Sequence, residues 1–482
     1  MINSLSTKVV RLNKHLPIKI AKITTTLVLS FSVVIMNNIY WIFYTAAQFL
    51  GFLFLCSDGS SHNFYYELAF IFTLCLSTAI LPFLYSQKPS RKILVLLGLI
   101  FLGLKLWAIH SKSFYEDDFY RYLVEARLLD QSLDPYLNSP HEVKNLILEG
   151  GFTKSQKYKI DTYQYAIKTG FGWMTAIYPP IVIQVFRLAD NPVQLGYLFL
   201  ISELIVFLCL TLLFKKIQPI LWLWWLHPLP LIEVYLNKHY DLWIGLAVLF
   251  SLAAIISRNW KLSALGLALG VHLKGFALCF VPFMNRKVIF NFIIIYTFIE
   301  SISYYSFPSR FADQNSLVSF AAMWEFNNGV YTWSRVFIQS LDFISSPNLI
   351  ARLIFSSLLL LGLLWVFFRP NKQSVFIRVS ILFFMFSPVT NPWYLLMCLP
   401  FFLVFSLDRR EFHFFSLCPI YYFLWIAPNP MVALPWTTAL QWFVLLYLLI
   451  YLPKSKNYGR EKHAFQIEQQ TDPLILEDRS SE

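Results

Sequence analysis

The stretch KILVLLGLIFLGLKLWAI, residues 92–109, is almost wholly apolar, and the acidic stretch YEDDFYRYLVEARLLD, residues 115–130, follows it closely. A helix of about 20 predominantly apolar residues spans the hydrocarbon core of a bilayer, so the first stretch predicts a membrane crossing. Similar runs occupy residues 67–86, 194–214 and 349–368. Because the acidic stretch follows a crossing directly, we expect its carboxylates at a membrane surface.

The composition also indicates an integral membrane protein. Of 482 residues, 57% are hydrophobic and 18% are aromatic, more apolar surface than a soluble chain of this length hides. The net charge of +12 comes from short Lys and Arg clusters between apolar runs, which argues against a nucleic-acid partner. The six cysteines show no C-x-x-C pair and no metal-ligand spacing, so no disulfide framework is expected.

Lys and Arg mark the cytoplasmic side of a membrane protein, and here their clusters alternate with loops that lack them. This alternation predicts a multi-pass protein of the cell membrane, plasma or bacterial inner, with both termini cytoplasmic. Residues 1–22 would be a basic cytoplasmic N-terminus, residues 23–453 the transmembrane domain, and residues 454–482 a disordered cytoplasmic tail. Residues 110–193 and 305–345 would form two extracytoplasmic loops.

Two segments complicate the count of crossings. Residues 23–56 are long enough for two, but two would place the N-terminal cations outside, so we expect one crossing and an interfacial portion. Residues 261–284 have cations at both ends and a polar break at His272 and Lys274, which predicts a re-entrant pair of half-helices. The predicted fold is all-α and polytopic, with about twelve crossings, this pair, and amphipathic helices in the first outer loop.

The acidic stretch supports two interpretations. Asp118, Arg121 and Glu125 share one face of a predicted helix that Asp117 or Asp118 would cap, which describes a salt-bridged helix on the membrane surface. Alternatively, an ionised carboxylate at this depth accepts a proton from an attacking hydroxyl, and the neighbouring arginine favours its charged form.

Two further stretches carry polar groups at membrane ends or within apolar runs. EVYLNKHYD, residues 233–241, is either a polar loop or a site for sugar hydroxyls; His239 and Asp241 alone would make a poor metal site. Lys274 in GVHLKGFAL, residues 270–278, would either extend to the cytoplasmic surface or meet a lipid phosphate in a cavity.

Taken together, these stretches resemble the GT-C superfamily of integral-membrane glycosyltransferases, and within it the bacterial mannosyltransferase-like members that use polyprenyl-phosphate-linked sugars. The resemblance covers roughly residues 90–410. The family pattern has W-D-G after R-Y-L, where this chain has VEA at residues 124–126. The family also has G-x-N before P-Y, where this chain has Leu133 and Asp134. The motifs that carry it, in order, are DFYRY at 118–122, SLDPY at 132–136, YPP at 178–180, EVYLNKHYD at 233–241, GLALGVHLKGF at 266–276, EFNNGVY at 325–331 and NPWY at 391–394.

The resemblance implies transfer of a hexose such as mannose, with inversion, from a polyprenyl-phosphate donor to a glycan or lipid-linked acceptor outside the cytoplasm. An outer-loop carboxylate acts as general base, and Asp118 matches it best, followed by Asp117. No cofactor is implied, and the need for a divalent metal stays open. The substrate-binding residues it implies are Arg121, Tyr122, Glu125, Tyr178, Glu233, Asn237, His239, Asp241, Lys274, Asn327, Trp393 and Tyr394.

Two other functions fit a membrane protein of this kind. A transporter or flippase of lipid-linked sugars would place ionisable groups at the bilayer midplane on several helices, whereas here charges concentrate at membrane ends. A glycan ligase or polymerase with a diphosphate-linked donor would need paired cations, for which Arg187, Arg310 and Arg335 are available on the predicted outer side.

Overall fold

The computed structural model is predominantly helical in the part of the chain that it describes and has no strand there, as the sequence predicts. The crossings expected in 23–56 and 67–86, both termini and Asn327 lie outside that part. The described residues are 46, 50, 91–113, 117–152, 155–214, 218–311, 316, 319–320, 324–325, 329–341, 345–368, 375–405, 414–415 and 435–451.

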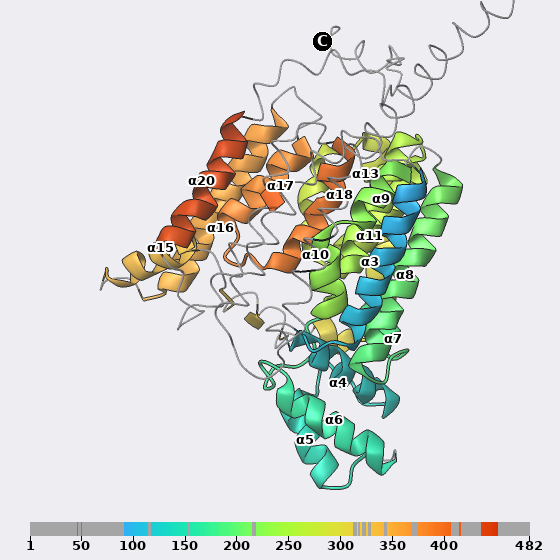
Figure 1. Ribbon diagram of the computed structural model, residues 1–482. Helices are drawn as coiled ribbons and strands as arrows, with labels where there is room; N and C mark the ends of the chain where they lie inside the picture. The colour runs from blue at the N-terminus through green and yellow to red at the C-terminus, as the bar shows by residue number, and fades with distance from the viewer. Residues whose placement is uncertain are drawn as a thin grey trace, which may run out of the picture.

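Four described helices are long and apolar enough to cross a membrane: α3 (Arg91–His110), α8 (Pro192–Leu213), α13 (Arg286–Ser306) and α16 (Pro347–Phe367). Three of them coincide with apolar runs singled out in the sequence. Shorter apolar helices complete the bundle (Figure 1), and the total of twelve crossings stays a prediction. They are α11 (Asp241–Ile256), α12 (Trp260–Leu273), α17 (Val375–Phe386), α18 (Leu395–Phe405) and α20 (Pro435–Tyr451).

The apolar pattern of residues 217–236 predicts a further crossing, but the described part of it, from Gln218, is not one continuous helix. It divides into α9 (Gln218–Trp225), the short α10 (Pro228–Pro230) and the π-helical turn η2 (Leu231–Leu236). Proline lacks the amide that would continue the hydrogen-bond ladder, and Nδ1 of His227 accepts the Leu229 amide at 3.1 Å in its place. The break therefore directs the EVYLNKHYD segment into an irregular turn.

Lys274 lies where α12 ends and the 3₁₀-helix η3 (Gly275–Phe283) begins. The hydroxyl of Tyr240 donates to the Leu273 carbonyl at 3.3 Å, which places this junction beside the start of α11. Two short helical segments thus meet at Lys274, and their re-entry from one side of the membrane stays a prediction. They bring the lysine to the end of the bundle where Asp241 lies.

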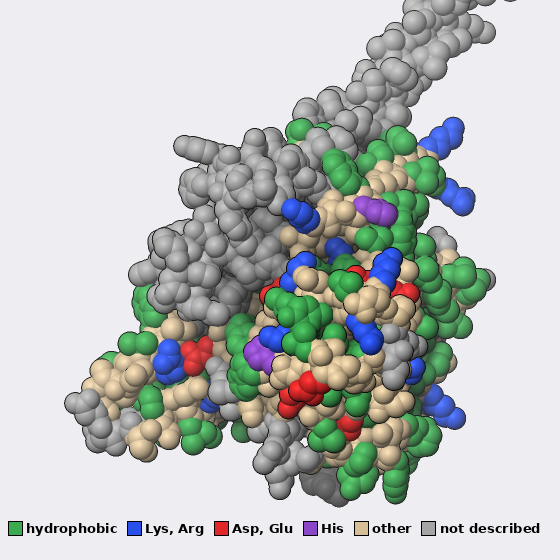
Figure 2. Space-filling view, turned by 90° about the horizontal axis from the view of Figure 1, so that it is seen from below, with side chains coloured by type: hydrophobic (Ala, Val, Ile, Leu, Met, Phe, Trp, Pro, Cys, Tyr) green, Lys and Arg blue, Asp and Glu red, His purple; other side chains and the backbone are tan. Residues whose placement is uncertain are grey.

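The first predicted outer loop folds as a helical cap over that same end of the bundle (Figure 1). Its helices are α4 (Asp118–Asp130), α5 (Pro140–Leu148), α6 (Gln156–Lys168) and α7 (Pro180–Phe186). They enclose a small apolar core of Val124, Leu128, Val143, Phe152 and Ala166. On the outside of the cap, acidic and basic side chains lie interspersed (Figure 2).

Segments from the second predicted outer loop lie beside the cap. They include η4 (Pro308–Phe311), whereas α15 (Gly329–Gln339) of the same loop packs on α16 and α20 (Figure 1). The short η5 (Pro392–Tyr394) precedes α18. Ser309 donates to Oδ2 of Asp134 at 2.5 Å, and Ser316 contacts Thr175 at 2.7 Å between their hydroxyl oxygens. These contacts join distant parts of the sequence around the end of the bundle.

Candidate active site

The start of α4 places two adjacent carboxylates in different surroundings. Asp117 occupies the N-cap position, but its side chain makes no capping hydrogen bond, contrary to that part of the sequence expectation. It is exposed and lies against Gly170, where an added Cβ would come within 3.3 Å of Oδ1. Asp118 begins the helix and is partly buried beneath the cap. Burial raises the pKa of Asp117, with Arg121 opposing the shift.

Asp118 has the electrostatics of a general base that works near neutral pH. Its burial and the neighbouring Asp117 carboxylate raise the pKa of Asp118 from its ordinary 3.8 to about 6. Arg121 and Lys274 oppose that shift, and Asp241 adds to it. These influences place Asp118 within one electrostatic cluster with Lys274 and Asp241, residues more than a hundred positions away in sequence.

Lys274 and Asp241 form an ion pair at the start of α11. Nζ of Lys274 donates to Oδ1 of Asp241 at 2.8 Å, and it also lies 4.0 Å from the centre of the Tyr394 ring. The lysine side chain is 24% exposed whereas the aspartate is 1% exposed. The lysine side chain is thus partly exposed, and the carboxylate and the ring hold its ammonium in place.

The EVYLNKHYD turn packs directly on the NPWY segment. His239 stacks on Trp393 with ring centres 3.9 Å apart. Nδ2 of Asn237 donates to Glu233 at 3.4 Å, and Nε2 of His239 lies 3.9 Å from the same carboxylate. All four side chains are buried, so in this structure these predicted sugar-binding groups contact one another.

Aromatic rings connect the cap to this turn. Tyr122 stacks on Phe186 at 4.6 Å and meets Tyr178 edge-on at 4.9 Å between ring centres. Tyr178 in turn meets Tyr240 at 5.2 Å. We did not single out Tyr240 in the sequence, although its place beside Asp241 in a motif was the available signal.

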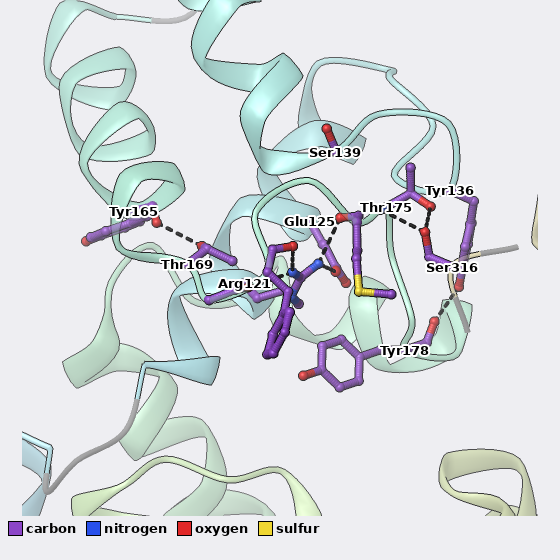
Figure 3. A network of polar contacts seen from close by, with 12 residues as sticks. Arg121, Glu125, Tyr136, Ser139, Tyr165, Thr169, Thr175, Tyr178 and Ser316 are labelled. Atoms are coloured by element: carbon purple, nitrogen blue, oxygen red, sulfur yellow. Dashed lines mark hydrogen bonds and ion pairs between the residues drawn. The ribbon is translucent and has the colours of Figure 1, made fainter. Parts of the chain in front are cut away.

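Arg121 has a role that its sequence position did not reveal. Its guanidinium donates to the carbonyls of Gly170, Phe171 and Met174 at 2.7, 2.6 and 3.0 Å (Figure 3). These bonds fix the loop that lies against Asp117, so Arg121 acts as a positioning residue there. Its predicted contact with substrate stays a prediction.

Glu125 lies next to Arg121, with 3.5 Å between Oε1 and Nη1, as the spacing on one helix face predicts. Neither carboxylate oxygen has a hydrogen-bond partner, and the side chain is fully buried. Burial raises the pKa of Glu125 to about 8. The group is therefore neutral at pH 7 and lies buried within the cap, and its contact with substrate stays a prediction.

Two ionic groups, one fully buried and one partly buried, were not predicted. Lys105 and Glu203 pair at 2.7 Å within the membrane helices α3 and α8. Nδ1 of His272 lies 2.7 Å from Glu300, which also meets Arg310 at 3.3 Å. Single polar residues inside long apolar runs were the available signal, because such residues need partners in a membrane.

No cluster of three or more His, Cys, Asp or Glu side chains able to hold a metal occurs among the residues placed by the structure. The chain matches no protein-family profile, no curated protein and no solved structure. The assignment of a function therefore rests on the geometry of the site.

Proposed function

We propose that the chain is a GT-C-type glycosyltransferase of the membrane. It would move a hexose such as mannose from a polyprenyl-phosphate donor to a glycan or lipid-linked acceptor on the extracytoplasmic side, with inversion. The observation that supports this most is Asp118, a carboxylate with a pKa of about 6 that interacts electrostatically with Lys274, whose side chain is partly exposed. A proton acceptor and a phosphate partner at one end of membrane helices are what this reaction needs.

The reaction follows from these two groups. The ionised Asp118 takes the proton of the acceptor hydroxyl as that oxygen attacks the anomeric carbon. The bond from that carbon to the phosphate oxygen breaks with inversion, and polyprenyl phosphate leaves with its electron pair. A base is most effective when its pKa lies near the working pH. Lys274 would stabilise the charge that develops on the leaving phosphate.

A monophosphate donor is favoured over a diphosphate donor by the pairing of the outer arginines. Arg187 meets Asp130 at 2.8 Å, Arg310 meets Glu300 at 3.3 Å, and Arg335 meets Glu325 at 2.9 Å. Each arginine already has a carboxylate partner. A second phosphate would have to displace one of these ion pairs.

An enzyme is also favoured over a transporter by the Lys105–Glu203 pair. Both side chains are fully buried, and Glu203 accepts hydrogen bonds from Trp224 at 2.8 Å and from Tyr235 as well. Groups on a transport path face a cavity or water. A closed, fully hydrogen-bonded pair instead holds helices together.

The test is incubation of the purified protein in nanodiscs with a panel of polyprenyl-phosphate sugars and candidate acceptors. We expect release of polyprenyl phosphate with at least one donor, dependent on acceptor and lost in Asp118→Asn. Movement of the intact donor between leaflets of proteoliposomes, without release of polyprenyl phosphate, would instead establish a flippase.

A further inference from the structure

A broad, open hollow of about 680 Å³ lies at the end of the bundle opposite the cap. It is bordered by the turn between α11 and α12 and by the first turn of α13. α11 begins at Asp241 in the candidate active site and ends beside this turn, so the two sites are separated by the length of a helix. The lining residues are Ser257, Arg258, Asn259, Trp260, Lys261, Arg286, Lys287, Phe290 and Asn291.

Two separate segments of sequence bring four cations to this hollow: Arg258 with Lys261, and Arg286 with Lys287. All four residues are exposed. None forms an ion pair with a carboxylate that the structure places, and no acidic residue lines the hollow. The local field is therefore strongly positive and is not neutralised by the described part of the protein.

The shape of the hollow is fixed by the chain itself. Oδ1 of Asn259 accepts the Leu262 amide at 3.1 Å, and Oδ1 of Asn285 accepts the Lys287 amide at 2.8 Å. Arg258 adopts a left-handed backbone with φ of 56° to close the turn. The cations thus project from two rigid helix starts.

The hollow continues onto an apolar face that is exposed on α13. Phe290, Ile293 and Ile294 are 66%, 56% and 54% exposed, on a helix long and apolar enough to span the membrane. A soluble anion would gain nothing from that face, whereas acyl chains would cover it. Trp260 adds a ring of the type that favours the membrane–water boundary.

We propose that this hollow binds an anionic phospholipid, with its phosphate among the four cations and its acyl chains along α13. Basic hollows between membrane helices suit such head groups. A preference of cations for the cytoplasmic side would explain why both segments are basic, but it would not explain why their cations gather around one hollow. The ligand is independent of the sugar donor, so this proposal stands or falls separately from the enzymatic one.

The experiment compares lipids retained by the purified full-length chain, using native mass spectrometry after exchange with phosphatidylglycerol or phosphatidylcholine. We expect selective retention of phosphatidylglycerol. Lys261→Gln with Arg286→Gln and Lys287→Gln should weaken it about 10²-fold, since each cation near an anionic surface contributes about 1 kcal/mol. The matched control is Lys144→Gln with Lys157→Gln and Lys159→Gln on the cap, which should leave retention unchanged.

Three results would overturn the proposal. Equal retention of the two lipids by the unmodified chain is the first, and it does not depend on any variant folding. The second is an equal loss of phosphatidylglycerol retention in the hollow variant and in the control variant on the cap. The third is thermal stabilisation by inorganic phosphate or glycerophosphoglycerol that matches phosphatidylglycerol, which would assign the hollow to a soluble anion.

Discussion

Asp117 and Asp118 are neighbours in sequence, yet one is exposed against Gly170 and the other is partly buried at the start of α4. Successive helical side chains point about 100° apart, so the two cannot share one target. Only Asp118 is coupled electrostatically to Lys274 and Asp241. The difference in surroundings favours Asp118 over Asp117 as the proposed base.

We therefore expect Asp118→Asn to lower turnover by on the order of 10² to 10⁴, with donor binding retained. Because a base must be ionised, and the pKa of Asp118 is about 6, the wild-type rate should rise with pH through about 6 and then level. Asp117→Asn is the control and should keep the plateau rate, with the rise moved to lower pH because the Asp117 charge no longer raises the pKa of Asp118. A dead Asp117→Asn beside an active Asp118→Asn would reverse the two roles.

Glu125 makes a prediction about stability. Its pKa rises from 4.5 to about 8 on folding, so between these values the unfolded chain has lost a proton that the folded chain retains. Stability contributed by this group thus falls as pH rises across that window. In Glu125→Gln, which mimics the neutral acid, the melting temperature should fall less between pH 5 and 8, roughly that window. If the melting temperatures of the two proteins changed equally with pH, the neutral state of Glu125 would be contradicted.

At the scale of elements, the junction of α12 and η3 places Lys274 where three elements meet. Its ion pair with Asp241 joins that junction to α11, and the Tyr394 ring adds a contact from η5. Three elements therefore converge on one ammonium. Such convergence would be needless for a lysine that only extended to the surface.

Lys274→Ala should weaken donor binding about 10- to 10²-fold, because a hydrogen bond to a charged group contributes about 1.5–3 kcal/mol. Binding of a polyprenyl-phosphate sugar in nanodiscs measures it. Since the variant leaves Asp241 unpaired, Lys274→Ala with Asp241→Asn should recover stability but not binding. Lys157→Ala, on the exposed side of α6, is the control. Unchanged donor affinity in Lys274→Ala and in Lys274→Ala with Asp241→Asn would exclude a phosphate contact.

The Lys105–Glu203 pair ties α3 to α8, and Trp224 extends the connection to α9. Lys105→Met leaves the buried carboxylate without its cation and should cost about 3–5 kcal/mol in unfolding free energy. Adding Glu203→Gln removes the charge and keeps an oxygen for Trp224, so the double variant should recover much of that loss. Denaturant titrations measure both; strictly additive effects would show that the two residues act independently.

At the scale of the whole molecule, the sequence predicted an all-α membrane class, three of the long apolar helices, and a helical cap after the first of them. Periodicity and run length carry that information. The break at His227 was missed, because residues 217–236 read as one apolar run. The burial of Arg121 and Glu125 was missed as well, since a helix face does not say which neighbour covers it.

The site was predictable as a set of motifs and not as a set of contacts. Asp118, Asp241 and Lys274 were each singled out for a local reason, and the structure brings them into one cluster. Stacking of His239 on Trp393 depends on a packing between the η2 turn and η5 that no local pattern encodes. Long-range pairing is thus the information that spacing alone lacked.

This arrangement, together with the charge pattern, predicts an orientation of the chain in the membrane that can be tested. The cap lies at the Asp241 end of α11, and the basic turn around Asn259 lies at the other end. Since cations favour the cytoplasmic side, reporters fused at Gln156 and inserted at Asn259 should report opposite sides of the membrane. A reporter at Tyr458 should agree with Asn259. Agreement between Gln156 and Tyr458 would place the cap in the cytoplasm, away from any extracytoplasmic acceptor.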